Sequence, residues 1–571
     1  MGYSGGMNAK RLSFAAFALL PLAAVCGAVL AAPPESPPAT RAQLQSQQNV
    51  VAELALQRGD CRTAAENFAA ASVGAPVAQA RHATEVAFDC QQPQAAWTAA
   101  QSWLAAAPND REAGIVYATA ALRLYLVPEA RTALAVVFKS APPMSDADIV
   151  GLAQVLVEQS DVNAAFAALT GFADTPAASP AVLTLMGQLA LQAYDFNRAQ
   201  ALVRQALQKE PQQPGALRLA ARLAVLRGDA AAAIAGAHAV MKADPTEGAF
   251  ELAEIYSDLN RPEDARKELE RLRATGDISG DEIDRRLALL DIDAGALPAA
   301  QKRLVALLDR GEASDGLVFL LAQVTADLGD GKTALGLFRK LLDSAVAAEA
   351  RAEAAGLLME QDKRAEALSL LDEGADEGAR STFQLLVGKT NLLADHGDAD
   401  GALALLAAGL QSYPRHPTLE YQQATLLERA GQTKDSVQAF EQLLTERPAD
   451  PTVQNALGYT LADHGQQLPR AEDLVRKALA AMPDSPAALD SLGWVRLRRG
   501  EPREASGILQ KAYSVGQDAD IAAHLGEALW LSGSHPQALK VWNEARARHP
   551  DSPLLDSTIK RLSKSGKAQT Q

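Results

Sequence analysis

Three cysteines are the side chains of this 571-residue chain with the clearest potential chemistry: Cys26, Cys61 and Cys90. Two thiols of an exported protein can be oxidised to a disulfide. A cysteine close to the N-terminus of such a protein can instead carry a lipid. Cys26 is therefore a candidate for lipid attachment, and Cys61 and Cys90 are candidates for a disulfide.

No other group of residues predicts chemistry. The eight histidines do not fall into a metal-ligand spacing: His535 and His549 are 14 residues apart, and His396, His416 and His464 lie in or near predicted turns. There is no glycine-rich nucleotide-binding loop and no nucleophile elbow. We therefore expect no enzymatic activity, no cofactor and no metal site.

The elements that position these residues are marked by a ladder of small residues at steps of 32 to 35 residues. A period of this size indicates a stacked helical repeat. A small side chain is required where two helices cross closely, because a longer one would push them apart. The ladder consists of Ala64, Ala96, Ala130, Ala165, Ala199, Ala233, Ala265, Ala300, Ala334, Ala367, Ala402, Ser436, Ala471, Ala505 and Ala538.

Other residue types also recur at fixed positions relative to the ladder. If the ladder residue is position 20 of a 34-residue unit, position 24 is bulky and apolar in most units, so the two positions form one helix stripe. Proline closes seven units, where it stops a helix. Glycine at position 8 lets a neighbouring helix approach, and occurs as Gly187, Gly458, Gly493 and Gly526.

These marks resemble the tetratricopeptide repeat family, most clearly in "LTLMGQLALQAYDFNRAQALVRQALQKEP" from Leu183 and "ALDSLGWVRLRRGEPREASGILQKA" from Ala488. The resemblance implies an all-α fold: a right-handed superhelical solenoid of about 15 antiparallel helix pairs over residues 45–552. One extra residue at or beside Leu468 departs from the period. Because repeats occupy the chain, no segment of about 100 residues remains for a catalytic domain.

The C-terminal segment "SPLLDSTIKRL" predicts a helix over residues 553–563 that covers the last repeat. Ser552 can cap its N-terminus, and Leu555, Ile559 and Leu562 share one face. We expect residues 564–571 to form a disordered tail.

The N-terminal segment predicts export. Lys10 and Arg11 precede an apolar run, and Val29 and Ala31 have the spacing of a signal peptidase site. Residues 1–31 are thus predicted to be a signal peptide, and residues 32–44 a proline-rich linker. The expected location is a Gram-negative periplasm. The alternatives are a retained membrane anchor and an outer-membrane lipoprotein facing the periplasm and lipidated at Cys26, although Val25 stands where such a site prefers Gly or Ala.

The repeat frame places Cys61 at position 17 of the first unit and Cys90 at position 14 of the second. These positions are the start of a second helix and the end of a first helix. Adjacent helices are antiparallel, so the two ends lie beside each other and predict a disulfide. The alternative is two half-buried free thiols.

The net charge is −15, from 54 Lys and Arg and 69 Asp and Glu residues. Acidic residues are spread along the chain and no basic stripe occurs, so nucleic acid is not an expected partner.

A solenoid of helix pairs exposes a face made by the first helix of each unit, chiefly at positions 2, 5, 9, 12 and 13. Packing does not dictate the residues at these positions, so they are candidates for binding a protein partner. The alternative for Trp494 is packing into the helix seam. Near the C-terminus the candidates are Tyr421, Arg429, Asn455, Tyr459, Asp490, Trp494 and Arg498.

The sequence therefore predicts a non-enzymatic scaffold for protein partners. Within the repeat family, "DSLGWVRLRRG" and "AAHLGEALWLSG" look like a group of large proteobacterial envelope proteins. One member is a lipoprotein that delivers cell-wall hydrolases to a carboxy-terminal processing protease, so the resemblance implies such partners here. Membrane association is expected only if Cys26 is lipidated. The alternative function is a scaffold of an exopolysaccharide export or envelope assembly system.

Overall fold

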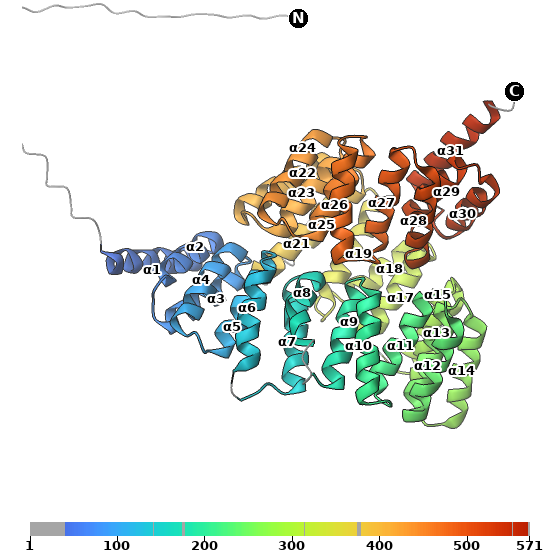
Figure 1. The fold of residues 1–571 in the computed structure, drawn as a ribbon, viewed down its shortest axis with the longest axis horizontal. Helices are drawn as coiled ribbons and strands as arrows, with labels where there is room; N and C mark the ends of the chain where they lie inside the picture. Colours follow the sequence, from blue (N-terminus) through green and yellow to red (C-terminus); the bar gives the residue numbers. More distant parts are fainter. Residues whose placement is uncertain are drawn as a thin grey trace, which may run out of the picture. The chain divides into compact units, whose positions relative to one another are not determined.

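A computed structural model describes residues 40–140, 142–173, 178–312, 314–373, 379–550 and 552–568. These residues form thirty-one α-helices and no strand, and successive helices pack in antiparallel pairs (Figure 1). The predicted signal peptide, residues 1–31, and the linker up to residue 39 lie outside the described residues. In the part of the chain that is described, no helix is both long and apolar enough to cross a membrane.

The fifteen pairs and one final helix agree with the predicted solenoid. The first helices of the pairs are α1 (Arg41–Gln57), α3 (Val77–Asp89), α5 (Arg111–Arg123), α7 (Asp146–Gln159), α9 (Pro180–Gln192), α11 (Pro214–Leu226), α13 (Pro245–Asp258), α15 (Gly280–Asp293), α17 (Asp315–Asp327), α19 (Ala347–Glu360), α21 (Ala379–Asp395), α23 (Pro417–Arg429), α25 (Pro451–Asp463), α27 (Pro486–Arg498) and α29 (Ala519–Leu531). The second helices are α2 (Cys61–Ser72), α4 (Pro93–Ala106), α6 (Val127–Lys139), α8 (Val162–Ala173), α10 (Phe196–Lys209), α12 (Ala230–Ala243), α14 (Pro262–Thr275), α16 (Leu297–Asp309), α18 (Gly331–Arg339), α20 (Arg364–Asp372), α22 (Ala399–Ser412), α24 (Thr433–Glu446), α26 (Leu468–Ala481), α28 (Pro502–Val515) and α30 (His535–Arg548).

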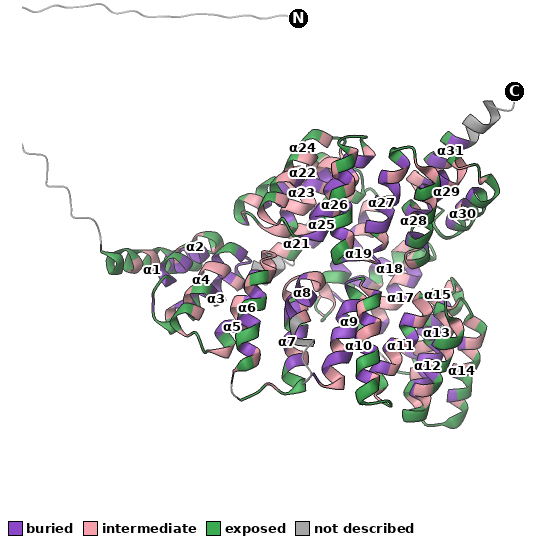
Figure 2. Cartoon of the chain, viewed as in Figure 1, coloured by how far each residue is buried: buried purple, intermediate pink, exposed green. Residues whose placement is uncertain are grey.

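The ladder of small residues lies at the helix crossings, as predicted. All fifteen ladder residues are 0% exposed. The single serine, Ser436, donates its hydroxyl to the carbonyl of Ala424 at 2.8 Å, so its polar group is satisfied. Figure 2 shows buried residues on the facing sides of the helices and exposed ones on the outer sides. The repeat phase is therefore confirmed.

Glycine at position 8 has the predicted role of allowing close approach. A methyl group added to Gly458 would lie 2.6 Å from the Val475 side chain and 3.0 Å from the Ala471 carbonyl oxygen. Both contacts are shorter than packed atoms tolerate. A side chain at Gly458 would thus separate α25 from α26.

The extra residue of the repeat ladder lies in the turn between α25 and α26. Gly465 has a φ of 64°, as glycine does in most of these turns, and Gln467 adds a second left-handed residue with a φ of 43°. A left-handed conformation is unusual for glutamine. The turn accommodates the insertion in this way, and both helices keep their pairing.

Both ends of the predicted solenoid differ from the structure by a few residues. The first helix, α1, begins at Arg41, inside the predicted linker, because "RAQLQSQQ" consists of good helix formers. The final helix, α31 (Pro553–Ala568), continues through residues 564–568, which we predicted to be a disordered tail. No proline interrupts "SKSGKA", so the helix does not end at residue 563.

The final helix covers the last repeat as expected. The hydroxyl of Ser552 accepts a hydrogen bond from the amide of Leu555 at 3.3 Å and caps the helix. Leu555 and Leu562 are buried against the C-terminal core. This helix therefore takes the place of the next repeat.

Units far apart in the sequence also contact each other. A guanidinium nitrogen of Arg62 donates to the carbonyl of Gln411 at 2.7 Å, and the side-chain amide of Gln92 donates to the carbonyl of Ser412 at 2.9 Å. These bonds join the first two units to the end of α22. The repeat pattern does not predict them, because they connect residues about ten units apart.

Candidate protein-binding site

The predicted binding residues lie on three successive first helices. Tyr421 and Arg429 belong to α23, Asn455 and Tyr459 to α25, and Asp490, Trp494 and Arg498 to α27. The structure differs from the prediction in how far these side chains are free to meet a partner.

Asp490 and Trp494 have internal partners and are each only 7% exposed. The carboxylate of Asp490 lies 3.0 Å from Nδ1 of His524, and the indole of Trp494 stacks on the His524 ring with 4.2 Å between centroids. The indole N–H donates to Asp463 at 3.0 Å. Trp494 therefore packs in the helix seam, the alternative left open by its sequence position.

The same contacts shift the pKa of His524. Burial acts to lower the pKa of its imidazole, but the charge of Asp490 and their hydrogen bond outweigh burial, so the pKa is raised. The ring is 2% exposed. A buried hydrogen bond between His524 and Asp490 joins α27 to α29 at this point.

The remaining predicted residues keep some surface. Arg498 is exposed, with its guanidinium 5.6 Å from the centroid of the Trp494 ring. Arg429 is also exposed and forms an ion pair with Asp395 at 3.1 Å. Tyr421 and Tyr459 are half-buried, and burial raises the pKa of both phenols. Asn455 has a buried Oδ1 that no described residue hydrogen-bonds.

The two cysteines lie where the repeat frame placed them. Cys61 is the first residue of α2, Cys90 directly follows α3, and a disulfide joins them across a Cα–Cα distance of 5.2 Å. This bond connects the first two units. The lipidation candidate, Cys26, lies outside the described residues.

Three side chains lie close enough together to be metal ligands, although the spacing of the histidines did not predict such a group. Ligand atoms of Glu428, Asp463 and His464 lie within 4.8 Å of one another. His464 Nε2 lies 2.6 Å from Glu428 Oε1 and 3.1 Å from the hydroxyl of Thr433, so protein groups already pair with this nitrogen. The three residues come from two units, which is why sequence spacing could not identify them.

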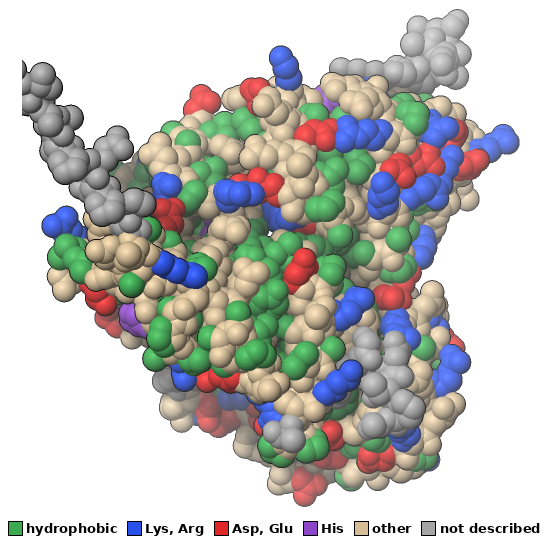
Figure 3. Space-filling view, turned by 60° about the vertical axis from the view of Figure 1, so that its left-hand side comes forward, with side chains coloured by type: hydrophobic (Ala, Val, Ile, Leu, Met, Phe, Trp, Pro, Cys, Tyr) green, Lys and Arg blue, Asp and Glu red, His purple; other side chains and the backbone are tan. Residues whose placement is uncertain are grey.

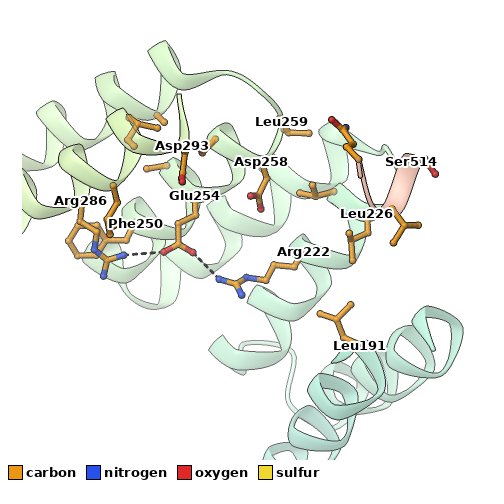
Figure 4. Close-up of a pocket in the computed structure, with 18 of the residues that line it drawn as sticks. Leu191, Arg222, Leu226, Phe250, Glu254, Asp258, Leu259, Arg286, Asp293 and Ser514 are labelled. Carbon is orange, nitrogen blue, oxygen red and sulfur yellow. Dashed lines mark hydrogen bonds and ion pairs between the residues drawn. The ribbon is translucent and has the colours of Figure 1, made fainter. Parts of the chain in front are cut away.

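A hollow along the first helices lies in the middle of the chain, away from the predicted residues. Two adjoining cavities of about 940 and 510 Å³ lie along α9, α11, α13 and α15, and α28 lines one side of the larger. Both cavities are lined by Leu191, Arg222, Phe250, Glu254 and Arg286, and we call the two together the central groove (Figure 4).

A row of charges crosses the central groove from unit to unit. Glu254 on α13 binds Arg222 of α11 at 2.8 Å and Arg286 of α15 at 3.1 Å, as Figure 4 shows. The guanidinium of Arg286 also lies 4.2 Å from the centroid of the Phe250 ring. These exposed pairs contribute little to stability, about 0–1 kcal/mol each. They present charged groups on a surface that folding does not require to be charged.

The central groove has more carboxylates than guanidinium groups. Three arginines and five acidic residues line it. No described residue hydrogen-bonds or ion-pairs with the side chains of Asp258 and Asp293, which point into the larger cavity (Figure 4). The groove is therefore acidic on balance.

Glu251 is the most unusual of these carboxylates. Glu251 is 4% exposed, and its buried Oε1 has no hydrogen-bond partner among the described residues. The nearest cationic atom is Nε of Arg222 at 3.7 Å. Burial raises the pKa of Glu251, an effect that Arg222 partly offsets.

The sequence pattern could have found most of this groove. Arg218 is at position 5 of its unit, Arg222 and Glu254 are at position 9, and Asp258 and Asp293 are at position 13. These are the positions predicted to face a partner, but the predicted binding residues lie only in the C-terminal units. The signal that distinguishes the middle units is their density of charge at those positions.

Charged side chains of both signs share the face of the molecule drawn in Figure 3. On the face shown in Figure 3, acidic and basic side chains are interspersed with apolar ones, and no large patch of a single sign stands out. This distribution differs from the basic stripe that nucleic-acid binding needs.

Comparison with known proteins agrees with the fold. Residues 184–247, 421–486 and 491–553 match the family model of the tetratricopeptide repeat. These matches and the helix pairs agree with an all-α solenoid that resembles those of tetratricopeptide repeats.

Among curated proteins, the chain is similar to a TPR repeat-containing protein of Pseudomonas aeruginosa. The two are 29% identical over 206 residues, which are 36% of this chain and 35% of the relative. The similarity thus spans about a third of the length of that relative.

Solved structures to which the chain is similar include the APC/C hetero-tetramer Cut9–Hcn1, which is 16% identical with a TM-score of 0.31 over 86% of this chain and 96% of the other. MamA from Desulfovibrio magneticus RS-1 is 21% identical, with a TM-score of 0.25 over 30% of this chain and 97% of its own. A thermophilic TPR protein of Thermus thermophilus is 20% identical, with a TM-score of 0.29 over 31% of this chain and 97% of its own.

Proposed function

We propose that this protein is a non-enzymatic scaffold that binds protein partners along the first helices of its repeats. The observation that carries the proposal is the central groove. Four successive first helices line it, and their charged side chains at positions 5, 9 and 13 are not needed for the packing of the helix pairs. An acidic surface with apolar walls is suited to an extended segment of another protein.

We further propose that the scaffold works in the periplasm and delivers substrates to a carboxy-terminal processing protease. The predicted signal peptide supports the location. The resemblance of the C-terminal units to envelope proteins supports the protease, with cell-wall hydrolases as the substrates. Lipidation at Cys26 would anchor the same scaffold to the outer membrane, facing the periplasm.

Affinity capture from envelope extract tests both proposals. The bait is the full chain expressed in a Gram-negative host, compared with a groove variant that carries Asp258→Asn and Asp293→Asn. The matched control is Asp309→Asn, which removes an exposed carboxylate from the second helix α16. We expect the wild type and the control, but not the groove variant, to retain a processing protease and murein hydrolases.

Three other results would contradict the proposals. Capture of polysaccharide synthase or export-pore subunits would favour the alternative scaffold. Equal capture by the groove variant would remove the central groove as the binding surface. Recovery of the whole protein from the cytoplasm with an unprocessed N-terminus would contradict the location, whereas a mature N-terminus at Ala32 or a diacylated Cys26 would support it.

A further inference from the structure

The buried carboxylate of Glu251 is not required by the repeat. Glu251 is at position 6 of its unit, and the equivalent position in α11 is Leu219, which is buried. A leucine therefore satisfies the packing at this position. Burial of a carboxylate without a hydrogen-bond partner costs stability, so the glutamate needs an explanation outside folding.

No neighbouring cation neutralises this carboxylate fully. The 3.7 Å between Arg222 Nε and Glu251 Oε1 is too long for a hydrogen bond. Arg222 directs another nitrogen to Glu254 at 2.8 Å, and Arg218 binds Glu247 at 2.7 Å. The two arginines of α11 are thus already engaged, and Oε1 retains the capacity to accept a hydrogen bond.

The residues around Glu251 indicate which kind of hydrogen-bond donor could pair with its Oε1. Glu251 lines the smaller cavity of about 510 Å³, where Leu191, Leu219 and Phe250 supply apolar wall. An aliphatic stem can lie along such a wall while its charged end reaches a carboxylate. Among protein side chains, lysine and arginine have this combination, and an acidic side chain would be repelled.

We infer that the central groove selects a protein segment containing a lysine or arginine, whose cationic end pairs with Glu251 inside the smaller cavity. The inference rests on the proposed function, since it takes the groove to be the binding surface. Asp258 and Asp293 extend the preference along the larger cavity, so the segment is basic over more than one residue. A buried charge-assisted hydrogen bond of this kind is among the stronger ones in proteins.

Selection from a random peptide library tests the inference on the full chain. The probes are the recovered peptides themselves, made synthetically with a photo-crosslinker, so that labelling of α11, α13 and α15 identifies those bound in the groove. We expect groove-bound peptides to contain Lys or Arg, and replacing that residue by norleucine should weaken binding at least about tenfold, equivalent to about 1.4 kcal/mol.

The decisive variant is Glu251→Gln, which keeps the shape and removes the charge. We expect at least about a tenfold loss of affinity for the same peptides, with a melting temperature equal to or above that of the wild type. Glu247→Gln is the matched control, because Glu247 lines the same cavity but is already paired with Arg218. It should change affinity by much less.

The possible results distinguish failure of this inference from failure of the proposed function. Peptides that label the groove but bind equally well without their Lys or Arg, or equally well to Glu251→Gln, would overturn the inference and leave the proposed function standing. Peptides that never label the groove would overturn both. If Glu251→Gln lowered the melting temperature, the carboxylate would be needed for folding, and Glu251→Leu should then fold poorly as well. This result would contradict the inference.

Discussion

The carboxylate of Asp484 accepts a hydrogen bond from the backbone amide of Phe196 at 3.1 Å, although 288 residues separate them. The amide of Asp484 also donates to the carbonyl of Tyr194 at 2.8 Å, and Lys511 holds the other carboxylate oxygen at 2.7 Å. The first turn of α10 is thus capped from another part of the solenoid. This contact brings α28 to the edge of the central groove.

We predict that Asp484→Ala releases this connection. Loss of a hydrogen bond to a charged acceptor costs about 1.5–3 kcal/mol, and the cost should appear at the contact. Hydrogen exchange should quicken around residues 194–198 and 483–486 and stay unchanged in α13 to α20. Asp484→Asn retains an acceptor and should be milder. Unchanged protection at both segments would contradict the role of this bond.

Overpacking a ladder position should damage the fold locally. Ala505 is 0% exposed at the crossing of α27 and α28, and Ala505→Leu should destabilise the protein by about 1–3 kcal/mol. Ala547→Leu, at an exposed site of α30, is the control and should be nearly neutral. Since repeat stability is a sum of local and neighbour contributions, exchange should quicken in α25 to α30. A uniform response along the chain would be inconsistent with this.

The disulfide should stabilise the first two units. Cys61 and Cys90 are 29 residues apart, and closing a loop of that length contributes roughly 3–4 kcal/mol in the chain-entropy description. Cys61→Ser with Cys90→Ser should therefore lower the melting temperature of α1 to α4. Peptide mapping of the exported, non-reduced protein should recover the linked pair. Two alkylatable thiols in the native protein would refute it.

Trp494 should act mainly on stability. Because its ring is buried against His524 and bonded to Asp463, Trp494→Ala should cost about 3–5 kcal/mol. Arg498→Ala, at an exposed site, should leave the melting temperature almost unchanged. If Arg498 contacts a partner, the same variant should lose about 1 kcal/mol or more of binding. A stable Trp494→Ala protein with weakened binding would restore Trp494 to the binding surface.

His416 is the N-cap residue of α23, and Glu420 lies within this helix. As the pH falls, protonation of these two residues should change the stability of the fold in opposite directions. Burial, together with Arg123 and Arg447, lowers the pKa of His416 to about 4. Burial and the neighbouring Glu446 raise the pKa of Glu420 to about 7. Between pH 7 and 4.5 the unfolded chain protonates at His416 first, which destabilises the fold, whereas the folded chain protonates at Glu420 first, which stabilises it.

Each effect reaches at most about 3 kcal/mol, so the wild type should change little over this window. His416→Gln should become more stable as the pH falls from 7 to 4.5. Glu420→Gln should become less stable over the same range. Denaturant titrations of the three proteins at several pH values measure this, and parallel curves for both variants would contradict the assignment.

The sequence by itself determined the helix pairs, their number and their phase. Small residues must stand where helices cross, so Ala64 to Ala538 record the crossings directly, and the positions of Cys61 and Cys90 follow from the same frame. These features depend on contacts within a unit or between neighbours. A periodic sequence specifies such contacts one unit at a time.

The tertiary structure alone decided which surfaces are hollow and which side chains are free. Trp494 and Arg498 are both on α27, yet one is buried and the other exposed, because α29 supplies His524 opposite the indole. The bond between Asp484 and Phe196 and the line of charges through Glu254 depend on how successive units are rotated. That rotation is the sum of small angles at each crossing, which no single unit of the sequence encodes.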